Sequence, residues 1–221
     1  MFLCLCRRDV RSKLRAYRRK FYNLFSRIYD KFVKLHSKDK GRQARKALVD
    51  LVDPEKDKLI VDLCTGTGTL LQYLADKSSG SRIIGIDFSR GMLKKAKEKT
   101  KNKNNIYFIE ADVANMPLKN ERCDKIICSH AFYELKGIDQ RKLLKEVQRA
   151  MKPEGVFLIM EHEVPKNPIV KFLFYIRILT MGTKTAFAIL KREEPLLKKY
   201  FMDVSKKHSY SSKSKIYICK K

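Results

Sequence analysis

Three acidic side chains, Asp62, Asp87 and Asp112, stand at or just after the ends of three apolar segments. If these segments are parallel strands, their carboxyl ends meet at one edge of a sheet, and the three carboxylates border one crevice. A carboxylate about 20 residues beyond the first turn can accept hydrogen bonds from two ribose hydroxyls. A carboxylate after the next strand can accept one from an adenine amino group. Each acid alone is more often a surface group or a helix cap, but together they predict a nucleoside site.

A glycine-containing turn follows the first of these segments. The sequence Asp62-Leu63-Cys64-Thr65-Gly66-Thr67-Gly68 joins an apolar run at 58–63 to a helical pattern at 70–76. Glycine lets the backbone turn tightly and approach a ligand that a Cβ would repel, and the amides at a helix N-terminus attract an anionic group. No Gly-Lys-Ser/Thr follows, so the turn is not a P-loop, whereas dinucleotide and mononucleotide sites both use such glycines.

These motifs fall within a regular alternation of strand and helix patterns. The expected elements are helix 41–51, strand 58–63, helix 70–76, strand 81–87, helix 91–99, strands 106–110 and 123–129, helix 139–151 and strand 156–161. Two further β-like segments, 201–208 and 215–219, predict an antiparallel C-terminal hairpin at one edge. The sequence therefore predicts an α/β fold with a doubly wound, mostly parallel seven-stranded sheet and helices on both faces.

Two regions lie outside this alternation. Residues 1–40 are expected to form a basic, amphipathic, helical N-terminal extension to a main domain at 41–221, and an apolar helical insertion is expected at about 165–190. One apolar stripe runs through the extension at helical spacing: Val10, Leu14, Tyr17, Phe21, Leu24, Ile28, Phe32 and Leu35. We expect the stripe from Phe21 to Leu35 to pack on the domain. For residues 10–20, packing and contact with an anionic membrane both remain open.

The net charge of +26 is concentrated at the two ends of the chain. Residues 1–50 carry a net charge of +12 and residues 198–221 one of +7. Such ends favour anionic partners, namely phospholipid surfaces, nucleic acid or acidic small molecules, although a lysine-rich surface also serves solubility alone. No apolar run approaches the roughly 20 residues that span a bilayer, and residues 2–6 are too short for a signal peptide. We therefore expect a cytoplasmic protein, either with or without peripheral contact with a membrane.

The six cysteines do not suggest a metal site. None forms a Cys-x-x-Cys pair, and no Cys/His cluster accompanies them. Cys64, Cys123 and Cys128 fall in or beside the expected strands, where a reduced and buried thiol is the usual state.

Four segments occur in the order typical of class I S-adenosylmethionine-dependent methyltransferases. They are Ile60–Gly68, Gly85–Leu93, Ala111–Leu118 and Met151–Gly155. The sequence resembles this family over roughly residues 28–163. The first segment and Ile28-Tyr29-Asp30 are most similar to the ubiquinone/menaquinone-biosynthesis C-methyltransferases. The resemblance implies a Rossmann-like methyltransferase fold with S-adenosylmethionine as cofactor.

The resemblance also implies a role for each residue of the cofactor site. Gly66 and Gly68, with Asp62, would hold the methionine portion. Asp87 would bind the ribose, and Asp112 with Val113 the adenine. Ser129 would lie near the sulfonium, and Tyr29 would close the pocket. The adenine would be flanked by further apolar side chains. The whole expected set is Tyr29, Asp62, Cys64, Thr65, Gly66, Thr67, Gly68, Asp87, Phe88, Met92, Asp112, Val113 and Ser129.

Two histidines are candidates for a general base. Methyl transfer from a sulfonium is an in-line displacement that needs alignment of the nucleophile and exclusion of water, and a base helps when the nucleophile carries a proton. His130 and His162 each follow the end of an expected strand, and Tyr133 or Glu161 could orient them. A histidine in such a loop is also often a hydrogen-bonded structural residue.

The expected acceptor is a small or lipid-like molecule, reached in the second case from an anionic membrane surface. An RNA or protein methyltransferase that uses the basic termini is an alternative. However, Cys128-Ser129-His130-Ala131 occupies the position where nucleic-acid amino-methyltransferases carry an Asn/Asp-Pro-Pro-aromatic turn. A non-catalytic S-adenosylmethionine-binding scaffold is a second alternative. An NAD oxidoreductase is a weaker one, because it needs neither Asp112 nor the turn at 152–155.

Overall fold

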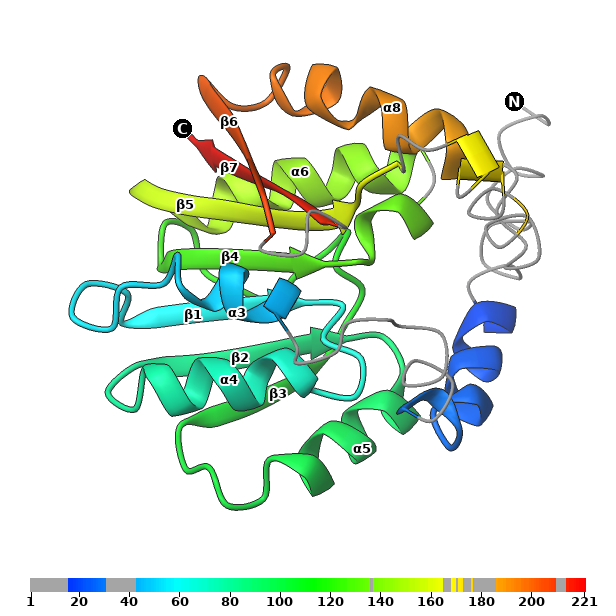
Figure 1. Cartoon of the computed structure of the whole chain (residues 1–221). Coiled ribbons are helices and arrows are strands. Elements are labelled where there is room, and N and C mark those ends of the chain that lie inside the picture. The colour runs from blue at the N-terminus through cyan, green and yellow to red at the C-terminus, as the bar shows by residue number, and fades with distance from the viewer. Residues whose placement is uncertain are drawn as a thin grey trace, which may run out of the picture.

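Five apolar segments form the parallel part of a seven-stranded sheet (Figure 1). They are β1 (Leu59–Leu63), β2 (Arg82–Asp87), β3 (Ile106–Glu110), β4 (Cys123–Ser129) and β5 (Met151–His162). The strands lie in the order β3-β2-β1-β4-β5-β7-β6. β2 and β3 follow on one side of β1, whereas β4 and the later strands lie on its other side, so the order in which strands are added reverses between β1 and β4. Ligands of such sheets bind beyond the carboxyl ends of the strands at this reversal.

This computed structural model describes residues 16–30, 43–135, 137–164, 168–169, 171–172, 176, 186–209 and 214–221. Among them, no helix is long and apolar enough to cross a membrane.

The last two strands form the predicted antiparallel hairpin. β7 (Ser214–Lys220) lies between β5 and β6 (Asp203–His208) and is antiparallel to both. It pairs with β5 from Val156 to His162, so the hairpin extends the sheet beyond β5. The predicted fold, a mostly parallel seven-stranded sheet with an antiparallel C-terminal hairpin, is confirmed.

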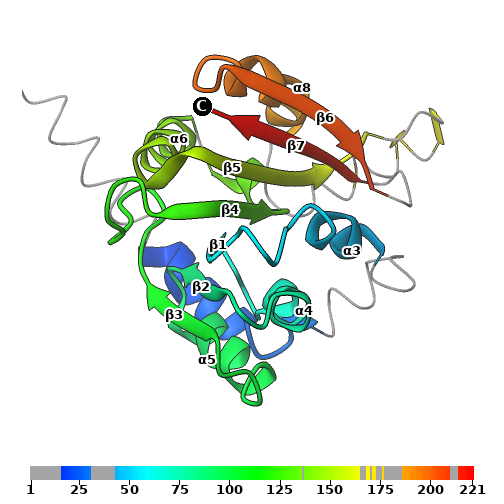
Figure 2. The same ribbon diagram turned by 90° about the vertical axis from the view of Figure 1, so that its left-hand side faces the viewer.

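Helices cover both faces of the sheet. Residues of α3 (Gln43–Val49) and α4 (Thr69–Lys77) pack on one face, and residues of α6 (Ile138–Ala150) and α8 (Ala186–Leu197) pack on the other. Figure 2 shows α4 and α6 on opposite sides of the strands. A fifth helix, α5 (Arg90–Lys99), contacts β2, β3 and α4.

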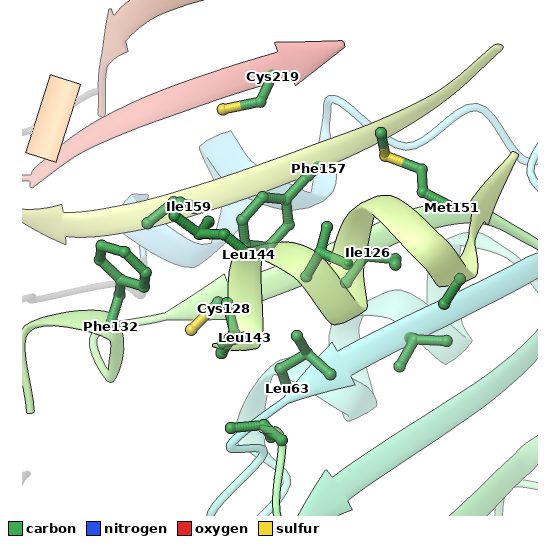
Figure 3. Packing of buried hydrophobic residues seen from close by; sticks show 14 of the residues in the cluster. Leu63, Ile126, Cys128, Phe132, Leu143, Leu144, Met151, Phe157, Ile159 and Cys219 are labelled. Atoms are coloured by element: carbon green, nitrogen blue, oxygen red, sulfur yellow. The ribbon is translucent and has the colours of Figure 1, made fainter. Parts of the chain in front are cut away.

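The central strands are apolar on both faces because both faces are covered. Alternate residues of β5 belong to different clusters: Phe157 and Ile159 pack with α6, whereas Leu158 and Met160 pack with α3 and α4. Figure 3 shows Leu144 of α6 beside Phe157 and Ile159, and Leu143 beside Cys128, in the first cluster. Burial of these side chains contributes about 1.5–3 kcal/mol each, relative to leaving them in water.

The N-terminal extension does not pack as the sequence predicted. Residues 16–25 form a helix, and it is followed by a turn at 26–28. Phe21, Leu24 and Ile28 were expected to pack on the domain, but all three are exposed. The inward face instead carries Tyr22 and hydrogen-bonding groups such as Asn23, because it borders a cavity of mixed polarity and not a closed apolar core. Val10, Leu14, Phe32 and Leu35 lie outside the described residues.

Other expected elements differ from the structure in their bounds. The strand expected at 156–161 begins at Met151, because Met151 pairs with Cys123 across a register shift in β4. Helix α8 continues to Leu197 where no helix was expected, and Phe201, expected to begin a strand, is a buried core residue before β6. Most of the expected insertion at 165–190 lies outside the described residues.

Candidate functional site

Sharp turns follow the two central strands and open a crevice between them. Cys64, directly after β1, has a φ of 54°, and His130, directly after β4, has a φ of 52°. This left-handed backbone is uncommon for residues with a Cβ and is enriched at functional sites. The amide of His130 donates to the Met160 carbonyl at 2.7 Å, which ties its turn to the neighbouring strand.

The glycine turn is compact because two helices meet beneath it. Gly68 has a φ of 73°, and a Cβ added there would lie 2.8 Å from the Cβ of Ala96 on α5. The position therefore requires glycine for its backbone conformation and for the close approach of α5. Gly66, with a φ of 55°, faces the cavity.

Two carboxylates accept hydrogen bonds from residues of this turn. Asp62 is buried and accepts a hydrogen bond from the Thr65 hydroxyl at 2.5 Å. Asp87 accepts from the backbone amide of Gly66 through Oδ2 and from that of Ser89 through Oδ1, each at 2.9 Å. A carboxylate has about four acceptor sites, so Asp87 retains the capacity to accept from two ligand hydroxyls.

Burial changes the acidity of both carboxyls. It raises the pKa of Asp62 to about 7, and the Thr65 hydrogen bond offsets only part of this effect. It also raises the pKa of Asp87 to about 6, against the lowering effect of the two amide hydrogen bonds. Asp87 is therefore ionised at neutral pH, as an acceptor for ribose hydroxyls should be, and Asp62 is close to its titration point.

The expected adenine side of the cavity lies beyond β2 and β3. The side chain of Asp112 accepts from the amide of Ala114 at 2.9 Å, which fixes the turn after β3. Asp112, Val113, Phe88 and Met92 all line the cavity. The arrangement suits a flat ring held between apolar side chains with a carboxylate at its edge.

The expected acceptor side lies beyond β4 and β5. Ser129 and His130 line the cavity, and the ring of His162 stacks on that of His130 with centroids 4.3 Å apart. Tyr133 is buried against His162, with ring centroids 5.9 Å apart. Burial raises the pKa of the Tyr133 hydroxyl, so it stays protonated.

Glu161 positions the backbone beside the two histidines. Its Oε1 accepts from the amides of Phe132 and Tyr133, at 2.8 and 3.4 Å. These amides belong to the short helix η1 (Phe132–Glu134), so Glu161 fixes the backbone beyond His130. That Glu161 also orients a histidine side chain stays a prediction.

The N-terminal helix forms one wall of the cavity. Asn23 accepts through Oδ1 from the Ser89 hydroxyl at 2.8 Å and from the Gly91 amide at 2.9 Å. A Cβ at Gly91 would lie 2.7 Å from the Asn23 carbonyl oxygen and 2.8 Å from Ser26 Oγ. Glycine at position 91 is thus required for the helix to contact the turn after β2.

Glu134 joins this wall to the acceptor side. It receives hydrogen bonds from the Tyr22 hydroxyl and from Arg18 Nη2, the second at 3.2 Å. Burial raises the pKa of Glu134, while Tyr22 and Arg18 lower it. On the adenine side, Arg19 is hydrogen-bonded to Glu110. Sequence reasoning gave no role to Arg18, Arg19, Tyr22, Asn23 or Glu134.

Many of these groups border one cavity of about 860 Å³, within the range of small-molecule sites. Nine of the expected cofactor residues line it: Tyr29, Cys64, Gly66, Asp87, Phe88, Met92, Asp112, Val113 and Ser129. Four do not line it but lie within the glycine turn or under it: Asp62, Thr65, Thr67 and Gly68. These four shape the loop, and their direct contact with the cofactor stays a prediction. Of His130, His162 and Tyr133, only His130 lines the cavity.

Comparison with known proteins agrees with this geometry. Residues 60–155 match the family described as Methyltransferase domain. The chain is 30% identical over 165 residues to the demethylmenaquinone methyltransferase of Staphylococcus carnosus, in an alignment that covers 72% of this chain and 67% of that relative.

Solved structures show the same fold. A SAM dependent methyltransferase from Aquifex aeolicus gives a TM-score of 0.59 at 16% identity, with 86% of this chain and 96% of that chain covered. Human N-acetylserotonin methyltransferase in complex with SAM gives a TM-score of 0.63 at 18% identity, with 92% and 56% covered. With the S. carnosus relative, these similarities show that the chain belongs to the class I S-adenosylmethionine-dependent methyltransferases, close to the menaquinone-biosynthesis group, and that S-adenosylmethionine is its cofactor.

Proposed function

We propose that this enzyme methylates a small, lipid-like acceptor with a ring-shaped head group, such as a quinol. The observation that carries the proposal is the aromatic and mixed-polarity wall on the acceptor side. Tyr22, Tyr29, His130 and Leu135 border the cavity there. The S. carnosus relative, a demethylmenaquinone methyltransferase, supports the same class of acceptor.

The residues of the cavity fit S-adenosylmethionine. Asp87 offers ionised acceptor sites for ribose hydroxyls, and the turn at Gly66 leaves space because nothing lies within 4 Å of a Cβ built there. Asp112, with Phe88 and Met92, suits an adenine ring. When bound, the cofactor supplies an electrophilic methyl group on a sulfonium.

We infer that the protein contributes alignment, exclusion of water and one proton acceptor. The helix at 16–25 forms one wall of the cavity, and we infer that its contacts through Asn23 and Tyr22 hold this wall in place against entry of water. His130 is proposed as the base that takes a proton from the acceptor hydroxyl or carbon, with the stacked ring of His162 holding its orientation. Alignment of this kind can lower a barrier by about 7–11 kcal/mol.

The proposal is tested with radiolabelled S-adenosylmethionine and a fractionated cell extract. Label is expected in the organic-soluble fraction with the wild-type protein and strongly reduced with His130→Asn. Label in RNA or protein would instead support a macromolecular acceptor that uses the basic termini. Binding of S-adenosylmethionine with no transfer to any fraction would support a scaffold and overturn the proposal.

A further inference from the structure

One face of the N-terminal helix exposes a continuous row of large apolar side chains. Tyr17 is 68% exposed, Phe21 48%, Leu24 66% and Ile28 55%. Their spacing of four, three and four residues puts Tyr17, Phe21 and Leu24 on one side of the helix, and Ile28 follows in the turn after it. Single exposed apolar residues need no explanation, but an aligned row of them marks an interaction surface.

The row is exposed because the opposite face of the helix is firmly held. Tyr22 and Arg18 bind Glu134, and Asn23 binds the turn at Ser89–Gly91. On the same inward side, the ring of Tyr22 contacts that of Phe88, with centroids 5.7 Å apart. The helix cannot rotate to bury the row without breaking these contacts.

The charges around the row favour an anionic partner. Lys20 and Arg27 are exposed beside it, and the whole chain carries a net charge of +26. Within residues 16–30 the acidic side chain is Asp30, which is paired with Lys99 at 2.9 Å. An apolar row flanked by cations is the pattern of helices that lie in the surface of an anionic bilayer, with aromatic rings at the level of the head groups.

The row also lies beside the mouth of the cavity. Ala16, Arg18 and Lys20 of the same helix line it. Figure 1 shows this helix, in dark blue, at the end of the sheet where the parallel strands terminate. The described pieces at 168–169, 171–172 and 176, in yellow, lie at the same end. Those pieces expose Ile169, Phe172 and Ile176.

We propose that Tyr17, Phe21, Leu24 and Ile28 insert into an anionic phospholipid bilayer, with Lys20 and Arg27 at the phosphate groups, and that this sets the cavity mouth on the lipid surface. The docking itself does not require methyl transfer. Its purpose rests on the proposed lipid-like acceptor, which could then enter the cavity without crossing water.

The test is co-sedimentation of the full chain with vesicles, with no cofactor or acceptor present. Wild-type protein is expected to bind vesicles of phosphatidylcholine and phosphatidylglycerol, and to bind phosphatidylcholine alone far more weakly. Leu24→Asp is expected to lower the partition coefficient at least about tenfold, because an inserted leucine is replaced by a charge. The matched control is Met202→Asp, since Met202 is 90% exposed directly before β6, at the amino end of the neighbouring parallel strands.

Calorimetric binding of S-adenosylmethionine checks that Leu24→Asp remains folded with an intact cavity, because Leu24 points away from it. The proposal is overturned if the wild-type protein fails to sediment with anionic vesicles at low salt, or if Leu24→Asp and Met202→Asp bind them equally. It is also overturned if the row proves to join two copies of the chain, seen as a lipid-free dimer that Leu24→Asp dissociates. Loss of docking with retained methylation of a soluble acceptor would separate this failure from failure of the proposed function.

Discussion

Replacement of Gly91 by alanine should detach the N-terminal helix from the cofactor cavity. The new Cβ would lie 2.7 Å from the Asn23 carbonyl oxygen, which is backbone and cannot swing aside. The helix must therefore move, and the two hydrogen bonds of Asn23 to Ser89 and to the Gly91 amide are lost. At about 1 kcal/mol each, they contribute about 2 kcal/mol to docking of the helix, equivalent to a factor of about 30.

An opposing effect is smaller. Gly91 lies in the first turn of α5, where alanine is favoured over glycine by at most about 1 kcal/mol. Detachment should therefore prevail, and the unfolding midpoint should change little because the apolar core is untouched. If the docked helix is needed for tight binding, the affinity for S-adenosylmethionine should fall up to about 30-fold.

The measurement combines isothermal titration calorimetry with limited trypsin digestion. Faster cleavage after Lys20 and Arg27 should accompany the weaker binding of the cofactor. Gly80→Ala is the matched control, since nothing lies within 4 Å of a Cβ built at Gly80. Wild-type affinity and wild-type protection from trypsin in Gly91→Ala would refute the reasoning.

Four further predictions concern pH, catalysis and the core. Asp62 and Asp87 hold their protons more tightly in the folded chain, with pKa values of about 7 and about 6 against an ordinary 3.8. The unfolding free energy should therefore fall as pH rises through this window, and Asp62→Asn should make the fall shallower in urea titrations. Affinity for S-adenosylmethionine should decline below about pH 6 as Asp87 gains a proton, and an unchanged affinity would contradict its role at the ribose. His130→Asn, which tolerates the left-handed backbone, should lower kcat about 10²–10⁴-fold while leaving cofactor affinity intact, whereas an unchanged kcat would exclude His130 as the base. Leu144→Ala should lower the unfolding free energy by about 2–5 kcal/mol. A smaller loss would show that the neighbouring core side chains move to fill the space left by the leucine.

The sheet could be predicted because its signals are local. Continuous apolar runs, short connections and residues such as Gly66 indicate buried parallel strands and the turn between them. Asp87 and Asp112 could then be assigned to one cavity from the rule that parallel strands end together. The start of β5 at Met151 could not be predicted. Met151 joins this strand because it pairs with Cys123, and no local sequence pattern indicates such a register shift.

The N-terminal wall could not be predicted for a different reason. The contacts of Asn23 with Gly91 and of Tyr22 with Glu134 join residues 68 and 112 positions apart. Hydrophobic periodicity assigned the buried face of the helix to Phe21 and Leu24, as it would in a helix packed on an apolar core. The inward face here borders an open cavity of mixed polarity and not an apolar core, so the rule predicted the wrong side.

The two edge strands bear on how the protein behaves when it is concentrated. β3 and β6 end the sheet, and an open edge can pair with the edge of another molecule. Arg82 of the neighbouring strand β2 lies over the ring of Tyr107 on β3, with the guanidinium carbon 5.6 Å from its centroid, and β6 carries Lys206 and Lys207. Like charges at both edges repel a second copy. At about 1 M salt the Debye length shrinks to about 3 Å, so high ionic strength, which usually favours the handling of basic proteins, should promote edge-to-edge aggregation of this one.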